Sequence, residues 1–292
     1  MAMLSMGFNF PSVSLLRRQL DMFDEGRSLL AGAVGGPCAV FVLTPQRNAM
    51  TLSAKQYGMS FFGLYRQVFS EGLLKGFRGG YRPTVMSVPQ FTAIGPMYLA
   101  MEKRTGCVPL SMLFASAVES LLTYSAQKRN AQIQYNAVIK QMGTSGGKRA
   151  TELRLTPMYN VVGPGFTFHV MRNVFAMLGI RLLSPHSRQI VERIPGSTAI
   201  PAEALDLSAD FVSSIAAAAL SMPFNHVFSW TACSPEIEQL SYVQRARASA
   251  AFLVTNYTER GVRLLGRDLA VRISYTGFLF TIYRCIERQL VD

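Results

Sequence analysis

Residues 211–235 read FVSSIAAAALSMPFNHVFSWTACSP and contain no Asp, Glu, Lys or Arg. A helix that crosses the hydrocarbon core of a bilayer needs roughly 20 such residues. Stretches 28–46 and 83–101 are equally free of charge. Three weaker stretches are 105–127, interrupted by Glu119, 155–180, interrupted by Arg172, and 264–288, with a clean centre between Arg272 and Arg284. The sequence therefore predicts an all-α membrane protein with six transmembrane helices.

The composition of the whole chain agrees with membrane spans. Of its 292 residues, 49% are hydrophobic and only 16% are charged, and the mean hydropathy is +0.21. These values are too apolar for an ordinary soluble protein. The alternative is a set of buried helices in a large soluble core. That alternative would require polar covering helices, which this composition does not supply.

The net charge and the cysteines exclude several classes of function. The net charge of +12 could suggest a nucleic-acid partner. However, most of the Lys and Arg residues lie between or at the ends of the predicted spans, so anionic lipid headgroups are the simpler partner and no nucleic acid is expected. The four cysteines lie far apart, in or beside predicted spans, and indicate neither a metal site nor a disulfide framework.

The first residues, 1–25, begin with a short apolar stretch followed by an Arg pair. Acidic residues follow, and the stretch has no convincing cleavage site. We expect a retained N-terminal segment, with a short amphipathic helix.

The chain repeats itself in three units. Pro45 is followed by Gln-Arg-Asn-Ala, Gln127 by Lys-Arg-Asn-Ala, and Pro223 by Phe-Asn-His-Val. These points lie 82 and 96 residues apart and mark the ends of odd-numbered spans. We expect one transmembrane domain, 26–290, built from repeats 26–104, 105–187 and 205–290. Residues 188–204, which contain prolines, are expected to form a loop.

Each unit has a polar segment between its two spans. In the first, Phe61, Phe62, Leu64, Val68 and Phe69 form an apolar stripe, which predicts a short amphipathic helix in the membrane interface. The third unit has a similar piece at 243–261. The second has the Gly-rich TSGGKRATELRL at 144–155.

With these residues the chain resembles the mitochondrial carrier family, the six-helix solute carriers of the inner mitochondrial membrane. The resemblance is most specific in the first unit and covers about residues 26–290. It rests on LLAGAVGG at 29–36, Thr44-Pro45, Phe61-Phe62-Gly63, Glu71-Gly72, Phe77-Arg78-Gly79, Pro83 and Pro89, with Gly165–Asn173 and a looser match at Glu259–Arg272. It implies three pseudo-repeats, a location in the inner mitochondrial membrane, and short amphipathic helices on the matrix side. Both termini would then face the intermembrane space.

The resemblance also implies a site for the phosphate of cardiolipin. An aromatic-basic-Gly triplet that opens a helix offers free N–H groups, a positive helix end and an Arg at headgroup depth. The candidate residues are Gly63, Gly72, Phe77, Arg78 and Gly79. The alternative is an ordinary helix start with an interfacial Arg.

The resemblance breaks where members of this family close the matrix side. Each odd helix of the family carries Pro-x-acid-x-x-base, and the acids and bases pair in a ring. Here the acid positions hold Arg47, Arg129 and Asn225, and the base positions hold Met50, Gln132 and Phe228. Two arginines in one narrow ring would repel each other. The ring therefore cannot form in the usual way. Gln127 replaces a proline, so the third span is expected to lack a kink.

Family members bind their solute halfway across the membrane. The corresponding positions here are Met86, Arg172, Asn173 and Arg272. An Arg at mid-membrane depth is costly, so it faces a polar cavity or a partner. Arg172 and Arg272 would bind a carboxylate or phosphate, or else pair with Glu119 or a neighbouring chain. His169 and His226 are expected to be core or interfacial residues.

Two functions follow from this pattern, and neither is enzymatic, because TSGGKR at 144–149 is not a phosphate loop and HExxH and GxSxG are absent. The first is a degenerate carrier retained as a structural or accessory subunit of a larger inner-membrane complex of the respiratory type, with no cofactor and with bound cardiolipin. The second is an active carrier that exchanges an anionic metabolite. The loss of the charged ring favours the accessory role, because transport requires interactions that differ between two states.

Overall fold

The structure is a computed structural model that describes residues 27–55, 58–144, 152–194, 200–259 and 261–291. The described residues form helices joined by turns and irregular segments, with no β-strand among them. The prediction of an all-α fold is therefore confirmed. The expected N-terminal segment 1–25 lies outside the described residues.

The first unit begins with α2 (Arg27–Val42) and α3 (Thr44–Ser53), which are separated only by Leu43. Pro45 lies in the first turn of α3, where its missing N–H breaks no helical hydrogen bond. The short helix α4 (Phe61–Val68) follows, and the side chain of Ser60 caps it by accepting from the Gly63 N–H at 3.1 Å. A 3₁₀ turn (Leu73–Phe77) then leads into α5 (Tyr81–Thr105).

The second unit consists of α6 (Val108–Thr144) and α7 (Phe166–Leu178); a π-helical turn (Gly179–Leu183) connects α7 to α8 (Ser184–Glu192). The third unit contains α9 (Ala202–Ala232), α10 (Pro235–Glu238) and α11 (Tyr242–Val254). A second π-helical turn (Thr255–Glu259) precedes α12 (Gly261–Val291). The amphipathic helices expected near 61–69 and 243–261 are thus both present.

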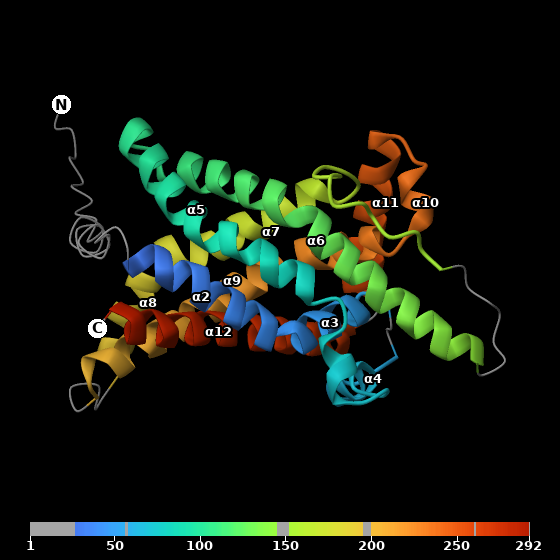
Figure 1. The fold of residues 1–292 in the computed structure, drawn as a ribbon, viewed down its shortest axis with the longest axis horizontal. Helices are drawn as coiled ribbons and strands as arrows, with labels where there is room; N and C mark the ends of the chain where they lie inside the picture. Colours follow the sequence, from blue (N-terminus) through green and yellow to red (C-terminus); the bar gives the residue numbers. More distant parts are fainter. Residues whose placement is uncertain (1–26, 56–57, 145–151, 195–199, 260, 292) are drawn as a thin grey trace.

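The long helices form a closed ring that follows the order of the chain. α2 packs against α5, α5 against α6, α6 against α7, α7 against α9, α9 against α12, and α12 returns to α2. In Figure 1 the long helices run roughly side by side, with α3, α4, α10 and α11 gathered at one end of the bundle. α3 lies inside this arrangement and contacts α6, α9 and α12.

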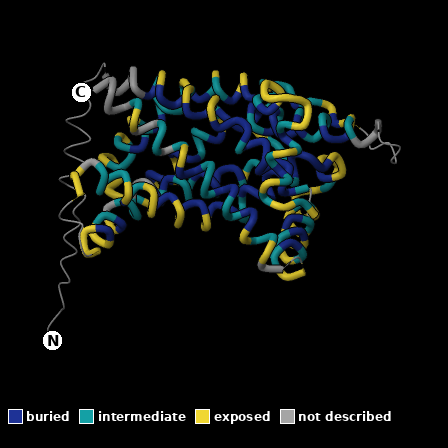
Figure 2. Tube along the Cα trace, turned by 90° about the horizontal axis from the view of Figure 1, so that it is seen from below, coloured by how far each residue is buried: buried dark blue, intermediate teal, exposed yellow. Residues whose placement is uncertain are grey.

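Small residues allow the helices to approach closely. A Cβ atom added at Gly36 of α2 would lie 2.4 Å from the Phe91 ring of α5, and one added at Gly32 would lie 2.9 Å from the Phe91 carbonyl oxygen. Such small residues four positions apart are typical of helix contacts in membranes. In Figure 2 the buried residues follow the inner sides of the helices, while exposed residues lie on the outer sides and at the ends.

Two described helical segments are long and apolar enough to cross a bilayer. They are Val108–Gln141 of α6 and Ala204–Ala232 of α9, and a shorter apolar segment covers Gly32–Val42 of α2. The other predicted spans do not meet this criterion among the described residues, so the six-span architecture stays a prediction.

Two boundaries predicted from the sequence were wrong. The stretch 155–180 was expected to be a span, but its helix begins only at Phe166, because Pro157 and the run Gly163-Pro164-Gly165 interrupt helical hydrogen bonding. The expected loop 188–204 is helical at both ends: α8 reaches Glu192 and α9 begins at Ala202. Pro201 stands directly before α9 and limits its start, without making the whole stretch a loop.

The third odd-numbered helix, α6, is a single helix of 37 residues. As expected, the break seen between α2 and α3 is not repeated in α6. α9 is likewise a single helix, although it contains Pro223. The far end of α6 contacts the first unit: Gln134 Nε2 donates to the Arg78 carbonyl at 2.7 Å, and Gln141 Nε2 donates to Glu71 Oε1 at 2.8 Å. The second unit therefore supports the polar turn of the first.

Candidate functional site: a buried arginine cluster inside the helix ring

Three helices present the same pattern of residues to one central cavity. Each contributes positions i, i+3 and i+4, which form one face of an α-helix. The contributing sets are Arg47, Met50 and Thr51 of α3, then Gln127, Asn130 and Ala131 of α6, then Asn225, Phe228 and Ser229 of α9. The sets lie 80 and 98 residues apart. None of these nine residues is acidic, and Arg47 is the only basic one.

Two corrections to the sequence prediction follow from this register. Arg129 and Gln132 do not face the cavity. Arg129 Nη1 instead donates to the Thr156 carbonyl at 3.2 Å, and Gln132 Oε1 accepts from the Thr156 N–H at 2.7 Å. The sequence prediction aligned Arg47 with Arg129, because both begin an Arg-Asn-Ala motif. In the structure Arg47 corresponds to Gln127, two residues earlier. Arg47, Met50, Asn225 and Phe228 do line the cavity, as expected.

Arg172 of α7 joins three helices at the cavity. Its Nη1 donates to Gln127 Oε1 of α6 at 2.9 Å and to Asn225 Oδ1 of α9 at 3.5 Å. Its Nε and Nη2 donate to Asn173 Oδ1 at 3.1 and 2.9 Å. The guanidinium also lies over the Phe228 ring, 5.5 Å from its centroid. Neutral side chains therefore hold this buried charge in place.

Arg272 of α12 has a similar environment. Its Nε and Nη2 donate to Ser221 Oγ of α9 at 3.2 and 3.1 Å, and its Nη1 lies 3.8 Å from Met50 Sδ. The guanidinium groups of Arg272 and Arg47 each lie 5.9 Å from the ring centroid of Tyr275. Two cations thus share one aromatic ring, a favourable but weak contact.

Arg47 is the least satisfied of the three arginines. Its Nη2 donates to the Val40 carbonyl at 2.9 Å, which is accessible because α2 ends at Val42. Its Nε and Nη1 are buried and have no hydrogen-bond partner. Buried N–H groups of a charged side chain are rarely left unpaired.

Among the described residues that line this cavity, Glu119 is the one that is acidic. Glu119 of α6 accepts from Gln90 Nε2 of α5 at 2.7 Å. Among the described residues, no carboxylate oxygen lies within 4.0 Å of Arg47, Arg172 or Arg272, so none of the three forms a salt bridge. Glu119 thus forms no salt bridge with Arg172 or Arg272, although its charge and that of Arg172 attract each other.

The cavity has a volume of about 80 Å³. Sites for small molecules have volumes of roughly 300–1,000 Å³, so this cavity holds only a few waters in this conformation. Of the expected solute contacts, Arg172, Asn173 and Arg272 line it, whereas Met86 does not. Gln90, one turn further along α5, takes that place. Sequence reasoning missed Gln90, Gln127 and Asn130. The i, i+3, i+4 spacing shared with α3 and α9 would have found Gln127 and Asn130, but not Gln90.

The turn expected to bind a lipid phosphate is occupied by contacts within the protein. Arg78 forms an ion pair with Glu71, and its carbonyl accepts from Asn48 Nδ2 at 3.2 Å. The Gly72 N–H donates to the Phe69 carbonyl at 2.9 Å, and the Gly63 N–H is bonded to Ser60. Phe77 stacks on Phe41 of α2, with ring centroids 5.2 Å apart. Gly79, with φ of +75°, lies against Asn130. We conclude that this turn chiefly joins α3, α6 and α5.

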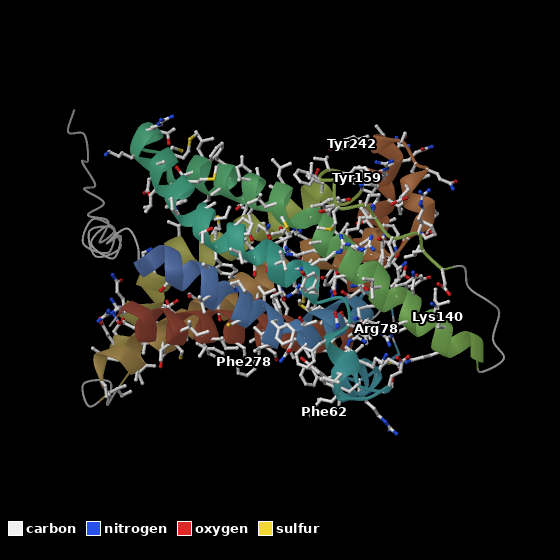
Figure 3. The ribbon with its side chains drawn as sticks, in the orientation of Figure 1. Phe62, Arg78, Lys140, Tyr159, Tyr242 and Phe278 are labelled. Carbon is white, nitrogen blue, oxygen red and sulfur yellow. The ribbon has the colours of Figure 1, made fainter. Side chains whose placement is uncertain are left out.

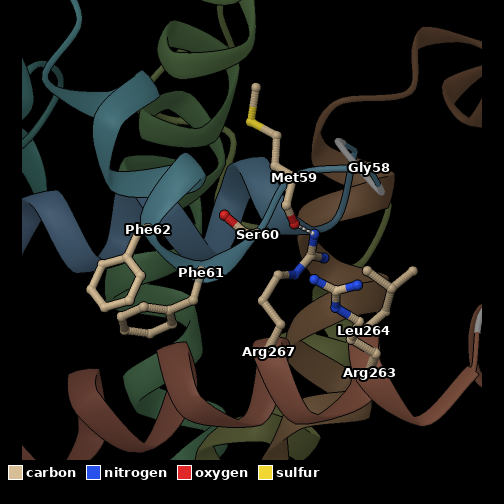
Figure 4. Close-up of a pocket in the computed structure, with 8 residues that line it drawn as sticks. All are labelled: Gly58, Met59, Ser60, Phe61, Phe62, Arg263, Leu264 and Arg267. Atoms are coloured by element: carbon tan, nitrogen blue, oxygen red, sulfur yellow. Dashed lines mark hydrogen bonds between the residues drawn. The ribbon is translucent and has the colours of Figure 1, made fainter.

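A different pocket, near α4, is lined by two arginines of α12. It has a volume of about 420 Å³ and is lined by Gly58–Phe62 together with Arg263, Leu264 and Arg267 of α12. Figure 4 shows both guanidinium groups reaching from α12 toward the Gly58–Ser60 segment. Arg267 donates to the Met59 carbonyl at 2.8 Å and pairs with Asp268, whereas Arg263 is exposed. The pocket therefore places Phe61 and Phe62, which precede Gly63, close to Arg263 and Arg267. The sequence analysis did not select these two arginines.

Glu71 provides a test of the polar turn through pH. Hydrogen bonds from Gln141 and Arg78 lower the pKa of its carboxyl below the ordinary value of 4.5. Because the folded-state pKa is depressed, the charged carboxylate stabilises the fold above pH 4.5, and this contribution is lost as the pH falls through the folded-state value. We expect wild type to be slightly more stable than Glu71→Gln at pH 7, and the difference in melting temperature to vanish in acid. Gln141→Ala should reproduce most of this loss, and a difference independent of pH would contradict the assignment.

No protein-family model matches this chain, and no curated protein matches it. The fold and the site thus define the class of molecule by themselves: an all-helical ring whose centre holds three buried arginines and neutral polar partners.

Proposed function

We propose that this chain is a multi-pass protein of the inner mitochondrial membrane, built from three pseudo-repeats on the pattern of the mitochondrial carriers. Three observations support this proposal. The helix ring follows the order of the chain, the cavity-facing sets share one spacing, and two helices have the length and composition of spans. By the resemblance, α4, α10 and α11 lie on the matrix side.

We further propose that the protein is a structural or accessory subunit of a larger inner-membrane complex. The observation that carries this proposal is the composition of the three cavity-facing sets. A carrier alternates between two states, and its ion pairs form in one state and break in the other. Here those positions hold no acid–base pair, and the arginines instead bond neutral side chains of neighbouring helices. Such contacts tie the helices together.

An anion carrier is the second candidate. The unpaired nitrogens of Arg47, Nε and Nη1, favour it, since charge-assisted bonds to a carboxylate or phosphate would satisfy their N–H groups. Arg172 and Arg272 line the same cavity, where Glu119 is the one acid among the described lining residues. For this function the helices would have to separate and enlarge the cavity, which would break the bond between Arg172 and Gln127.

Cardiolipin is the lipid we propose as a bound partner. Arg263 and Arg267 support this, because their pocket opens next to the capped end of α4 and the first turn of α12. Helix starts and arginines both favour phosphate oxygens. No cofactor and no catalytic residue is part of the proposal.

Native electrophoresis of gently solubilised mitochondrial membranes tests the main proposal. We expect this chain to migrate in fixed ratio with a large respiratory or ATP-synthesising complex, as identified by mass spectrometry. Migration as a free species would contradict the accessory role. Uptake of labelled anions into liposomes, reduced by Arg172→Ala and Arg272→Ala but not by an exposed control such as Arg247→Ala, would then support the carrier.

A further inference from the structure

The most exposed aliphatic residues of the turn between α4 and α5 form an apolar tip. Leu73 and Leu74 are 72% and 85% exposed. Phe62 of α4 and Tyr81 of α5 are 80% and 77% exposed. Large apolar side chains that are exposed to this extent and close in sequence indicate a contact with a protein or a membrane.

The backbone that carries this tip is firmly held. Asn48 Nδ2 donates to the Gly76 carbonyl at 2.8 Å, and the Phe69 ring packs so closely on Gly76 that an added Cβ would lie 2.2 Å from it. Within the turn, the Lys75 N–H donates to the Gly72 carbonyl at 3.1 Å. The leucines are therefore presented by an ordered turn, which reduces the entropy lost on binding.

The charges around the tip select its partner. Lys75 and Arg82 are exposed beside the leucines and Tyr81, whereas the negative charge of Glu71 is engaged by Arg78 and Gln141. The tip thus presents apolar side chains within a positive rim. An anionic lipid surface has the complementary chemistry, since its headgroups attract Lys and Arg while its acyl boundary accepts leucines.

A residue next to the tip is of a type found at the depth of the headgroups. Tyr81 begins α5, and tyrosines are enriched where helices enter a bilayer. In Figure 3, Phe62 projects away from the bundle at the same edge as Phe278, an exposed residue within α12. α4 and its following turn therefore lie beside a flank of the bundle that exposes apolar side chains.

We propose that Leu73 and Leu74 insert into the boundary between headgroups and acyl chains of an anionic bilayer, and that Lys75 and Arg82 bind its phosphates. This inference rests on the proposed membrane location. It adds a second lipid contact to the one at Arg263 and Arg267, and makes the first unit's turn an anchor.

Fluorescence quenching in reconstituted membranes tests the anchor. The chain has a single tryptophan, Trp230, which stacks on Phe252. In a Trp230→Phe background, Leu74→Trp is placed in nanodiscs of phosphatidylcholine and cardiolipin. We expect lipids with brominated chains to quench the fluorescence of this tryptophan, and aqueous iodide to leave it largely unquenched. Phosphatidylcholine alone, or Lys75→Gln with Arg82→Gln, should reduce the quenching by brominated lipid.

Phe114→Trp in the same background separates this inference from the proposed function. Phe114 lies on the exposed face of α6, within a segment that is long and apolar enough to span a bilayer. If brominated lipid quenches the Phe114→Trp variant but iodide quenches the Leu74→Trp variant, the anchor is overturned and the membrane location stands. If iodide quenches both variants, both proposals fall. If brominated lipid quenches the Leu74→Trp variant equally with and without cardiolipin, the proposed role of Lys75 and Arg82 is overturned.

Discussion

Replacing Gly79 by alanine is expected to destabilise the fold by about 3 kcal/mol, because strain and overpacking act together. Gly79 has a φ of +75°, which residues with a Cβ rarely adopt. The added Cβ would also lie 2.4 Å from Asn130 Oδ1. Displacing Asn130 would break its 3.1 Å bond to Asn48, the residue that holds the Gly76 and Arg78 carbonyls. Thermal unfolding in detergent should show a melting temperature lower by roughly 8 °C.

Gly106→Ala is the matched control for this variant. Gly106 also has a positive φ, +63°, where it ends α5, but no atom lies within 4 Å of its added Cβ. Only the strain remains, and it should cost about 1 kcal/mol. Equal losses in both variants would show that the contact with Asn130 does not hold the turn.

Glu238→Ala should lower the stability by about 2 kcal/mol, because it leaves a buried ammonium group without a partner. Lys128 of α6 is only 1% exposed, and its Nζ lies 2.6 Å from Glu238 Oε1 of α10. Glu238 itself is 54% exposed. Water near the carboxylate therefore reduces the loss below the roughly 3–5 kcal/mol typical of fully buried pairs. Chemical denaturation of the purified protein would measure it.

A second substitution isolates the cause. Lys128→Met removes the buried charge, and a methionine fits the space of the lysine stem. We therefore expect the double variant Lys128→Met/Glu238→Ala to recover most of the lost stability, since replacing both members of a buried pair is often neutral. If the double variant is as unstable as Glu238→Ala, then α10 is held by contacts other than this ion pair.

Hydrophobic patterning predicted the helices well and their ends poorly. The uncharged runs 83–101 and 211–235 fall largely within α5 and α9, and the stripe beginning at Phe61 forms α4. Of that stripe, however, Leu64 and Val68 are buried while Phe62 is exposed. Spans were expected to stop where charges begin, but α6 continues through Lys128 and Arg129 to Thr144. Lys128 is accommodated because Glu238, 110 residues away in the chain, pairs with it, and no local pattern reveals such a partner.

The sequence predicted that polar and basic residues face the centre of the ring, but it misaligned the positions on α6. Arg172, Asn173 and Arg272, which were chosen from the solute-contact positions that the family resemblance implies, do line the cavity. The cavity-facing positions of α6 were predicted two residues too late, because the two Arg-Asn-Ala motifs were aligned with each other. That match has a different meaning in the structure: its two asparagines, Asn48 and Asn130, hydrogen-bond to each other between α3 and α6. The arginines of the pocket in Figure 4 were overlooked because they adjoin the first unit only in the folded chain.

The unbroken helix α6 has a mechanical consequence. A stiff rod transmits a displacement at one end to the other, whereas a helix with a break absorbs it. Because Gln134 and Gln141 fasten the far end of α6 to the turn of the first unit, the second unit cannot tilt without pulling on the first. The third unit is fastened as well, because Glu238 pairs with Lys128 of α6 and Arg267 donates to the Met59 carbonyl of the first unit. A displacement of any one unit at this end of the ring is therefore passed on to the other two.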